Sequence, residues 1–172
     1  DDVIFSFDRQ GNTGNPWNQY IAGITYEYYN SMEMPSLIKE VVKVDDNTVK
    51  FVLTRPEAPF LANIAMPFAS IVSKEYADTL EAAGTKEDFN NLPIGTGPFK
   101  FVAYQKDAVI RYAKNADYWG EAPKIDDLIF AITPDAAVRL QKLKAGECHL
   151  MPYPAPADLE AIRADSTLKL DE

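Results

Sequence analysis

The sequence is poor in the residues that carry most nucleophilic and metal chemistry, with one cysteine, Cys148, and one histidine, His149. A Ser-His-Asp triad would need that histidine, but no Gly-x-Ser-x-Gly motif occurs. Neighbours on a strand point to opposite faces, so Cys148 and His149 cannot easily form a catalytic dyad. Two such residues also cannot supply the four ligands of a structural zinc site. We therefore expect no enzymatic activity, no metal site and no cofactor.

A single cysteine cannot close a disulfide within the chain. Cys148 is either a small buried thiol, as free cysteines often are, or one half of a bridge whose partner lies outside this chain. The residues alone leave both interpretations open.

Positive charge and long apolar runs are also scarce. The chain has 17 Lys and Arg against 26 Asp and Glu, a formal net charge of −9. No basic cluster reverses this locally, so a nucleic-acid partner is not expected. The most apolar run, residues 60–72, is interrupted by Asn63, Pro67 and Ser70, so membrane insertion is not expected. No signal peptide is visible, but the sequence does not begin like a natural N-terminus, and a mature chain or a cut chain would look the same.

The apolar fraction of 47% is sufficient for a packed core. In the first half, local patterns predict a helix over residues 1–10, a polar loop over 11–16 and a β-hairpin with strands at 38–44 and 49–53. The capping-box sequence 54–57 predicts a helix that runs to about residue 64 or 66, and a strand is predicted at 69–72. A further helix is predicted to begin after its cap, Ser73, and to end at Gly84.

Residues 90–98 contain two prolines and two glycines and form a candidate boundary between two structural units. The elements predicted after it are strands at 99–104, 108–113 and 125–133, a helix that Thr133-Pro134 caps and Gly146 ends, a strand at 148–151, a helix at 156–164 and a strand at 168–170. This alternation predicts an α/β (mixed α+β) fold with a parallel or mixed sheet and helices on its faces.

Two features look like functional motifs but do not match them. The acid pairs at 45–46 and 126–127 fit neither a calcium loop nor a positioned acid/base pair, so we expect solvated surface. The sequence Gly95-Thr96-Gly97 lacks the Gly-Lys-Ser/Thr ending of a phosphate loop and leads into a predicted strand instead of a helix. It therefore predicts a backbone turn.

An aromatic group comprises Trp17, Tyr26, Tyr28 and Tyr29. Such rings can line a cleft that holds a small ligand, since they offer apolar area with a polar tip. They can equally pack the core of a subdomain, and the pattern does not decide between the two.

Together, several strings resemble the family-5 extracytoplasmic solute-binding proteins of ABC importers, and the dipeptide-binding branch in particular. They are residues 1–8 (DDVIFSFD), 45–49 (DDNTV), 53–61 (LTRPEAPFL), 93–99 (PIGTGPF), 115–126 (NADYWGEAPKID), 143–147 (LKAGE) and Cys148 with 151–154 (MPYP). The resemblance covers essentially the whole chain, although family members are about three times longer.

The resemblance implies a fragment of a periplasmic-binding-protein-like type II fold, with a β-hairpin and helix subdomain followed by an alternating strand–helix portion of the first lobe. Residues 1–92 would belong to the extra domain typical of peptide binders, and residues 93–172 to the first ligand-binding lobe. It further implies a periplasmic protein that binds short peptides and partners membrane permease subunits. Tyr26 would face the ligand cleft, and Cys148 would pair with a cysteine outside this chain. A binder of heme or a nickel complex, or an autonomous structural module, stays open as an alternative.

Overall fold

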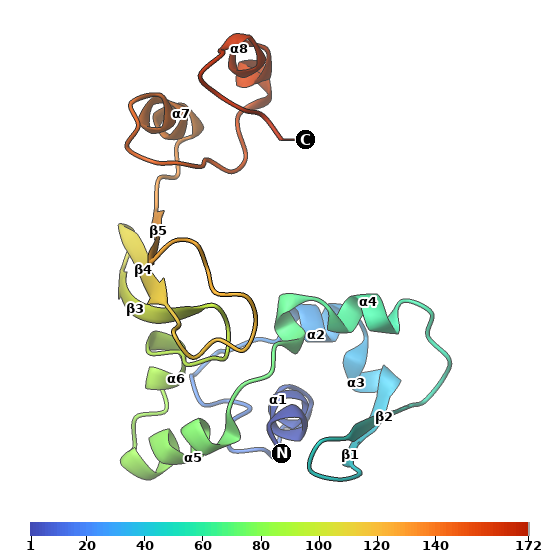
Figure 1. Cartoon of the computed structure of the whole chain (residues 1–172). Helices are drawn as coiled ribbons and strands as arrows, with labels where there is room; N and C mark the ends of the chain where they lie inside the picture. Colours follow the sequence, from blue (N-terminus) through green and yellow to red (C-terminus); the bar gives the residue numbers. More distant parts are fainter. Residues whose placement is uncertain (172) are drawn as a thin grey trace. The chain divides into compact units, whose positions relative to one another are not determined.

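The computed structural model describes residues 1–171 (Figure 1). These residues form two compact units. Unit 1 comprises Asp1–Phe101 and Lys114–Lys124, and unit 2 comprises Val102–Ala113 and the chain from Ile125 onward. The chain therefore leaves unit 1, contributes a short stretch to unit 2, and returns before continuing.

Unit 1 is built from short helices and one hairpin. Its elements are α1 (Asp2–Gly11), α2 (Glu27–Ser31), α3 (Met34–Leu37), β1 (Ile38–Lys43), β2 (Val49–Leu53), α4 (Phe60–Ile64), the 3-10 helix η1 (Pro67–Ala69), α5 (Lys74–Ala83) and α6 (Asp88–Asn91). The predicted first helix, hairpin and 74–83 helix are confirmed. Ser73 Oγ accepts a hydrogen bond from Tyr76 N, and Gly84 ends α5 at φ 74°, as helix-capping rules require.

Helix α1 lies between α5 on one side and α3 with the hairpin on the other (Figure 1), and its side chains belong to two apolar clusters of unit 1. Phe7 belongs to a cluster with α2, α3 and α4, whereas Phe5 packs with Trp17 and α5. The helix places successive side chains about 100° apart, so residues two apart can face different neighbours. One short helix thus joins both halves of the unit 1 core.

The segment predicted as a strand at 69–72 is not one. Val72 N donates to Ser6 Oγ at 2.9 Å, and Gln10 Nε2 donates to Phe68 O at 3.0 Å. Ser6 and Gln10 are both buried on α1. Ala69 N and Ser70 N bond to the Met66 and Pro67 carbonyls in the η1 turn, and Val72 bonds to a side chain of α1, so these groups need no neighbouring strand.

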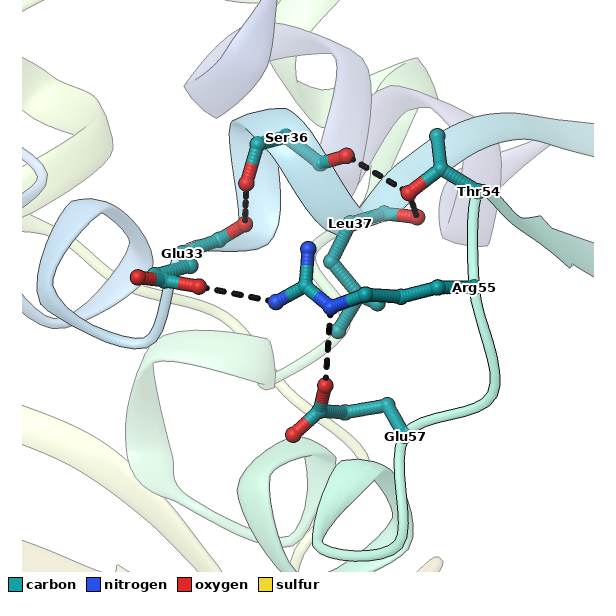
Figure 2. Close-up of polar contacts among 6 residues, drawn as sticks. All are labelled: Glu33, Ser36, Leu37, Thr54, Arg55 and Glu57. Atoms are coloured by element: carbon teal, nitrogen blue, oxygen red, sulfur yellow. Dashed lines mark hydrogen bonds and ion pairs between the residues drawn. The ribbon is translucent and has the colours of Figure 1, made fainter.

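The capping-box prediction at 54–57 is also wrong, because the helix begins only at Phe60. Thr54 Oγ1 instead donates to Ser36 O at 2.8 Å, 18 residues away. Arg55 bridges Glu33 and Glu57, at 2.8 and 3.2 Å (Figure 2). A long-range contact from the end of β2 to the α2–α3 turn has therefore replaced the local cap.

Unit 2 contains most of β3 (Phe99–Gln105) and β4 (Val109–Lys114), followed by β5 (Asp127–Ala131), α7 (Ala136–Lys144), the 3-10 helix η2 (Pro156–Asp158) and α8 (Leu159–Ala164). The sheet order is β3-β4-β5, and β4 pairs antiparallel with β5, with Ile110 opposite Phe130. The parallel or mixed sheet expected from the strand–helix alternation depended on strands at 148–151 and 168–170, which do not form; β4 and β5 are joined without the crossover helix that a parallel pair requires.

Three smaller predictions for unit 2 need correction. Asp135, not Thr133-Pro134, caps α7, since its side chain accepts from Val138 N. Residues 148–151 and 168–170 form no strand. In the first case no neighbouring strand lies beside them among the described residues. In the second, Leu168 N bonds to Asp165 O in a turn that follows α8.

Few apolar side chains of unit 2 are buried. Leu140 and Ile162 are its only buried hydrophobic residues among those described, whereas Ile129 and Phe130 on β5 are about half exposed. The core of the described chain therefore lies in unit 1, where the candidate site is found.

Candidate functional site

The aromatic residues predicted as a group occupy three different environments. Trp17 (2% exposed) and Tyr29 (4%) are core residues, while Tyr28 is 59% exposed. Only Tyr26 combines partial burial with a place on the wall of a cavity. The structure thus separates a packing role for Trp17 and Tyr29 from a possible ligand-facing position for Tyr26.

This cavity, here called the Tyr26 cavity, has a volume of about 280 Å³ and lies entirely within unit 1. Its lining comes from the end of α1, the 20–29 segment, the 67–72 segment and α6. Polar and aromatic side chains that line it include those of Arg9, Tyr20, Tyr26 and Asn90. The volume is just below the range of about 300–1,000 Å³ for ligand pockets, so it suits part of a small ligand.

The loop that carries the cavity wall is tied to the C-terminal end of α1. Asn12 and Asn15 both donate to the Asp8 carboxylate, at 3.1 and 2.6 Å. Asn15 Oδ1 in turn accepts from Trp17 N at 2.8 Å. Asn18, which is buried, donates to Arg9 O at 2.9 Å. Asparagine side chains thus fix a turn-rich segment that has no regular structure of its own.

Tyr26 is the residue before α2, and its hydroxyl is already engaged. It donates to Asn18 O at 3.0 Å and lies 3.3 Å from Trp17 O. Burial raises the pKa of Tyr26, and the nearby Arg9 charge opposes that rise. Its ring, more than its hydroxyl, is the part available to a ligand.

Arg9 is the cavity residue that sequence reasoning missed. Its guanidinium lies 5.7 Å from the Tyr26 ring centroid and 5.5 Å from that of Phe89. Its Nε atom is buried without a hydrogen-bond partner among the described residues. A basic residue in the last turn of a helix is expected for the helix dipole alone, so no signal in the sequence marked it.

Tyr20 and Asn90 close the other side of the cavity. The Tyr20 hydroxyl donates to Asn90 Oδ1 at 2.6 Å. Burial raises the pKa of Tyr20, although Arg9 and the bond to Asn90 both oppose the rise. This bond leaves the Asn90 amide nitrogen free to donate elsewhere.

The remaining predicted features lie away from this cavity. Cys148 is half-buried and forms no disulfide within the described chain, so its predicted outside partner stays a prediction. Asp45 and Asp46 are exposed; hydrogen bonds from the turn lower the pKa of Asp45, and Lys43 lowers that of Asp46. The first acid pair is thus engaged in the hairpin turn.

Two absences concern the described residues alone. No three of their His, Cys, Asp or Glu side chains are grouped closely enough to hold a metal ion. None of the helices formed by residues 1–171 has both the length and the apolar character needed to cross a membrane.

The family comparison decides the class. The profile of the bacterial extracellular solute-binding proteins, family 5 (middle region), matches residues 1–172. The chain belongs to this family. The mixed α/β structure is accordingly a piece of the periplasmic-binding-protein type II fold.

Known members of the family differ in what they bind. The chain is 58% identical to the dipeptide-binding protein of Escherichia coli K12, over 100% of this chain and 32% of that protein. It is 44% identical to heme-binding protein A of Haemophilus influenzae, over 100% of this chain and 31% of that protein. A solved dipeptide-binding protein from Pseudoalteromonas sp. SM9913, in complex with Met-Leu, matches with a TM-score of 0.89 and 36% identity, over 96% of this chain and 32% of that one. The chain therefore spans about a third of the length of its relatives.

Proposed function

We propose that the protein containing this chain is the substrate-binding component of an ABC importer that takes up dipeptides or short peptides. The observation that carries the proposal is the 58% identity to a dipeptide-binding protein along the whole chain. The solved relative with bound Met-Leu supports the same ligand class. The protein acts in the periplasm, delivers its ligand to membrane permease subunits, and catalyses no reaction.

In this proposal, residues 1–92 belong to the extra domain of peptide binders and residues 93–172 to the first ligand-binding lobe. Two lobes close on the peptide by a hinge motion and bury it between them. Burying a charged amine and a charged carboxylate requires partners of opposite charge. Tyr26 contributes one wall of the cleft through its ring, and further anchoring groups come from the rest of the protein. Cys148 forms a disulfide with a cysteine beyond this chain.

Calorimetry with dipeptides tests the proposal on the full-length protein and on the 172-residue chain. We expect micromolar or tighter binding by the full-length protein, and weak or no binding by the chain alone, because a cleft wall without its opposing lobe cannot bury the ligand. Binding of equal strength by the chain alone would contradict the two-lobe mechanism. A full-length protein that binds no short peptide would contradict the ligand class.

A heme ligand is the second candidate, favoured by the 44% identity to heme-binding protein A. Titration of the full-length protein with hemin distinguishes the two functions. If heme is the ligand, a saturable absorbance change appears that excess dipeptide does not reverse. If peptides are the ligand, hemin gives no saturable change.

A further inference from the structure

The positive charge of Arg9 is not neutralised by a carboxylate. The chain has nine more acidic than basic residues, and basic residues such as Lys43, Arg55 and Lys86 each lie within 3.2 Å of a carboxylate oxygen. Arg9 has no such partner among the described residues, although it is only partly exposed. A partly buried, uncompensated charge is unfavourable, so an anion that reaches it would be stabilised.

Its surroundings hold the guanidinium in place, with one donor engaged in a side-chain hydrogen bond to Tyr26. The Tyr26 and Phe89 rings both lie within 6 Å of Arg9 Cζ, and stacking on aromatic faces leaves the N–H edge of a guanidinium free. Because the Nε atom of Arg9 is buried, a ligand would approach the end of the guanidinium that carries the two Nη atoms. That end presents parallel donors matched to the two oxygens of a carboxylate.

Hydrogen bonding elsewhere in the cavity uses the hydroxyl protons of Tyr26 and Tyr20 but leaves the Asn90 amide nitrogen able to donate. The Tyr26 hydroxyl gives its proton to backbone oxygen, and the Tyr20 hydroxyl gives its proton to Asn90 Oδ1. The Asn90 amide nitrogen is then a neutral donor on the same cavity lining as Arg9. Glu27 is the one acidic residue on the lining, and because it is exposed to water its charge is screened.

We propose that the Tyr26 cavity is a carboxylate-binding subsite in which Arg9 contacts a carboxylate of the ligand end-on and Asn90 assists. The proposal rests on the peptide-binding function proposed above and adds a chemical preference to it. The carboxylate has two possible sources, an acidic side chain and the C-terminus of the peptide. The subsite disfavours an ammonium group at the same place, since two cations would then face each other.

Calorimetry on the full-length protein, with paired peptides, tests this. Ala-Glu against Ala-Gln reports the side-chain source, and Ala-Ala against its C-terminal amide reports the terminal source. In one of these two peptide pairs, R9Q should weaken binding of the member that carries the extra carboxylate by about 10- to 100-fold, as for a lost charged hydrogen bond. The uncharged member of that pair should change less than about threefold. R111Q, at an exposed arginine of β4, is the matched control and should change neither.

Several outcomes overturn the inference. One is an R9Q variant in which acid and uncharged ligands weaken equally, or not at all. If R9Q does not fold by circular dichroism, R9K takes its place, since it retains the charge without the planar fork. R9K should weaken binding of only the carboxylate-bearing peptide of the pair. An equal loss of affinity for both peptides of the pair refutes the subsite. The subsite is also refuted if the wild-type protein binds peptides but binds neither Ala-Glu more tightly than Ala-Gln nor Ala-Ala more tightly than its C-terminal amide. Wild-type protein that binds no peptide overturns the proposed function itself, and this inference with it.

Discussion

Replacing Tyr26 by phenylalanine separates the two roles that the structure gives to this side chain. The hydroxyl donates one hydrogen bond, shared between Asn18 O at 3.0 Å and Trp17 O at 3.3 Å. Losing one such bond lowers the free energy of unfolding by about 0.5–1.5 kcal/mol, or roughly 1–6 °C in Tm for a domain of this size. The ring that faces the cavity is unchanged. We therefore expect Tyr26→Phe to reduce stability while peptide affinity in the full-length protein changes by less than about threefold.

Urea denaturation followed by tyrosine and tryptophan fluorescence measures the stability, and calorimetry measures the affinity. Tyr28→Phe is the matched control, because Tyr28 is 59% exposed and its hydroxyl has no partner among the described residues. Its stability should stay within about 0.5 kcal/mol of wild type. Equal stability of the two variants would refute the anchoring role of the Tyr26 hydroxyl. A large loss of affinity at unchanged stability would show instead that the hydroxyl contacts the ligand.

The raised pKa of Tyr26 adds a dependence on pH. Burial favours the protonated phenol in the folded state, so this contribution to stability is fully present below the unfolded pKa. It is lost as pH rises through the folded pKa, because the unfolded chain then releases the proton more readily. Above the ordinary value of 10.0, wild type should therefore lose stability more steeply than Tyr26→Phe. Parallel curves of urea midpoint against pH would contradict this.

Three further predictions concern packing, backbone and redox state. Leu37→Ala should lower the free energy of unfolding by about 2–5 kcal/mol, since Leu37 is 1% exposed in the core, whereas Leu61→Ala, at a 74% exposed site, should have little effect in the same urea titration. Gly84→Ala should reduce Tm by an amount equivalent to about 1 kcal/mol, because φ is 74° there, while Gly95→Ala, where φ is not positive and no neighbour lies within 4 Å, should be close to neutral. In the unfolded, non-reduced full-length protein, Cys148 should resist alkylation until a reductant is added, and mass spectrometry that finds it alkylated beforehand would contradict the predicted disulfide.

Sequence patterns predicted the elements whose signals are local. The helix from Ser73 to Gly84 has its N-terminal cap, its apolar face and its terminating glycine within twelve residues, and it forms as expected. The β-hairpin is similar, since its turn residues lie between its two strands. In such elements the competing interactions are few, so propensity and capping decide the outcome.

The wrong secondary-structure predictions arise where a hydrogen-bond partner distant in the sequence competes with the local pattern. Thr54 carries a good capping signal, but its hydroxyl is bound by a carbonyl 18 residues away. The 69–72 segment has the pattern of a strand, but buried Gln10 of α1 binds the Phe68 carbonyl just before it and buried Ser6 binds Val72 at its end. The nearby sequence predicts neither contact, because both depend on how the chain folds back on itself.

The candidate site shows the same division. Tyr26 was found through its resemblance to relatives, and the structure adds that its hydroxyl is engaged and its ring lies on a cavity. Arg9 could not be found from the sequence, because what distinguishes it is the lack of a carboxylate neighbour. That property becomes visible only when the acidic side chains of residues 1–171 are considered in three dimensions.

The return of the chain to unit 1 has a practical consequence for dissecting the molecule. Buried Asn115 donates through Nδ2 to Gly97 O at 2.8 Å and through its backbone N to Pro98 O at 2.9 Å. A polypeptide that stops at Phe101 loses both donors. Topologically, residues 102–113 are an excursion out of a unit whose two flanks stay hydrogen-bonded to each other. Unit 1 should therefore be easier to isolate by replacing that excursion with a tight turn than by cutting the chain where it first leaves.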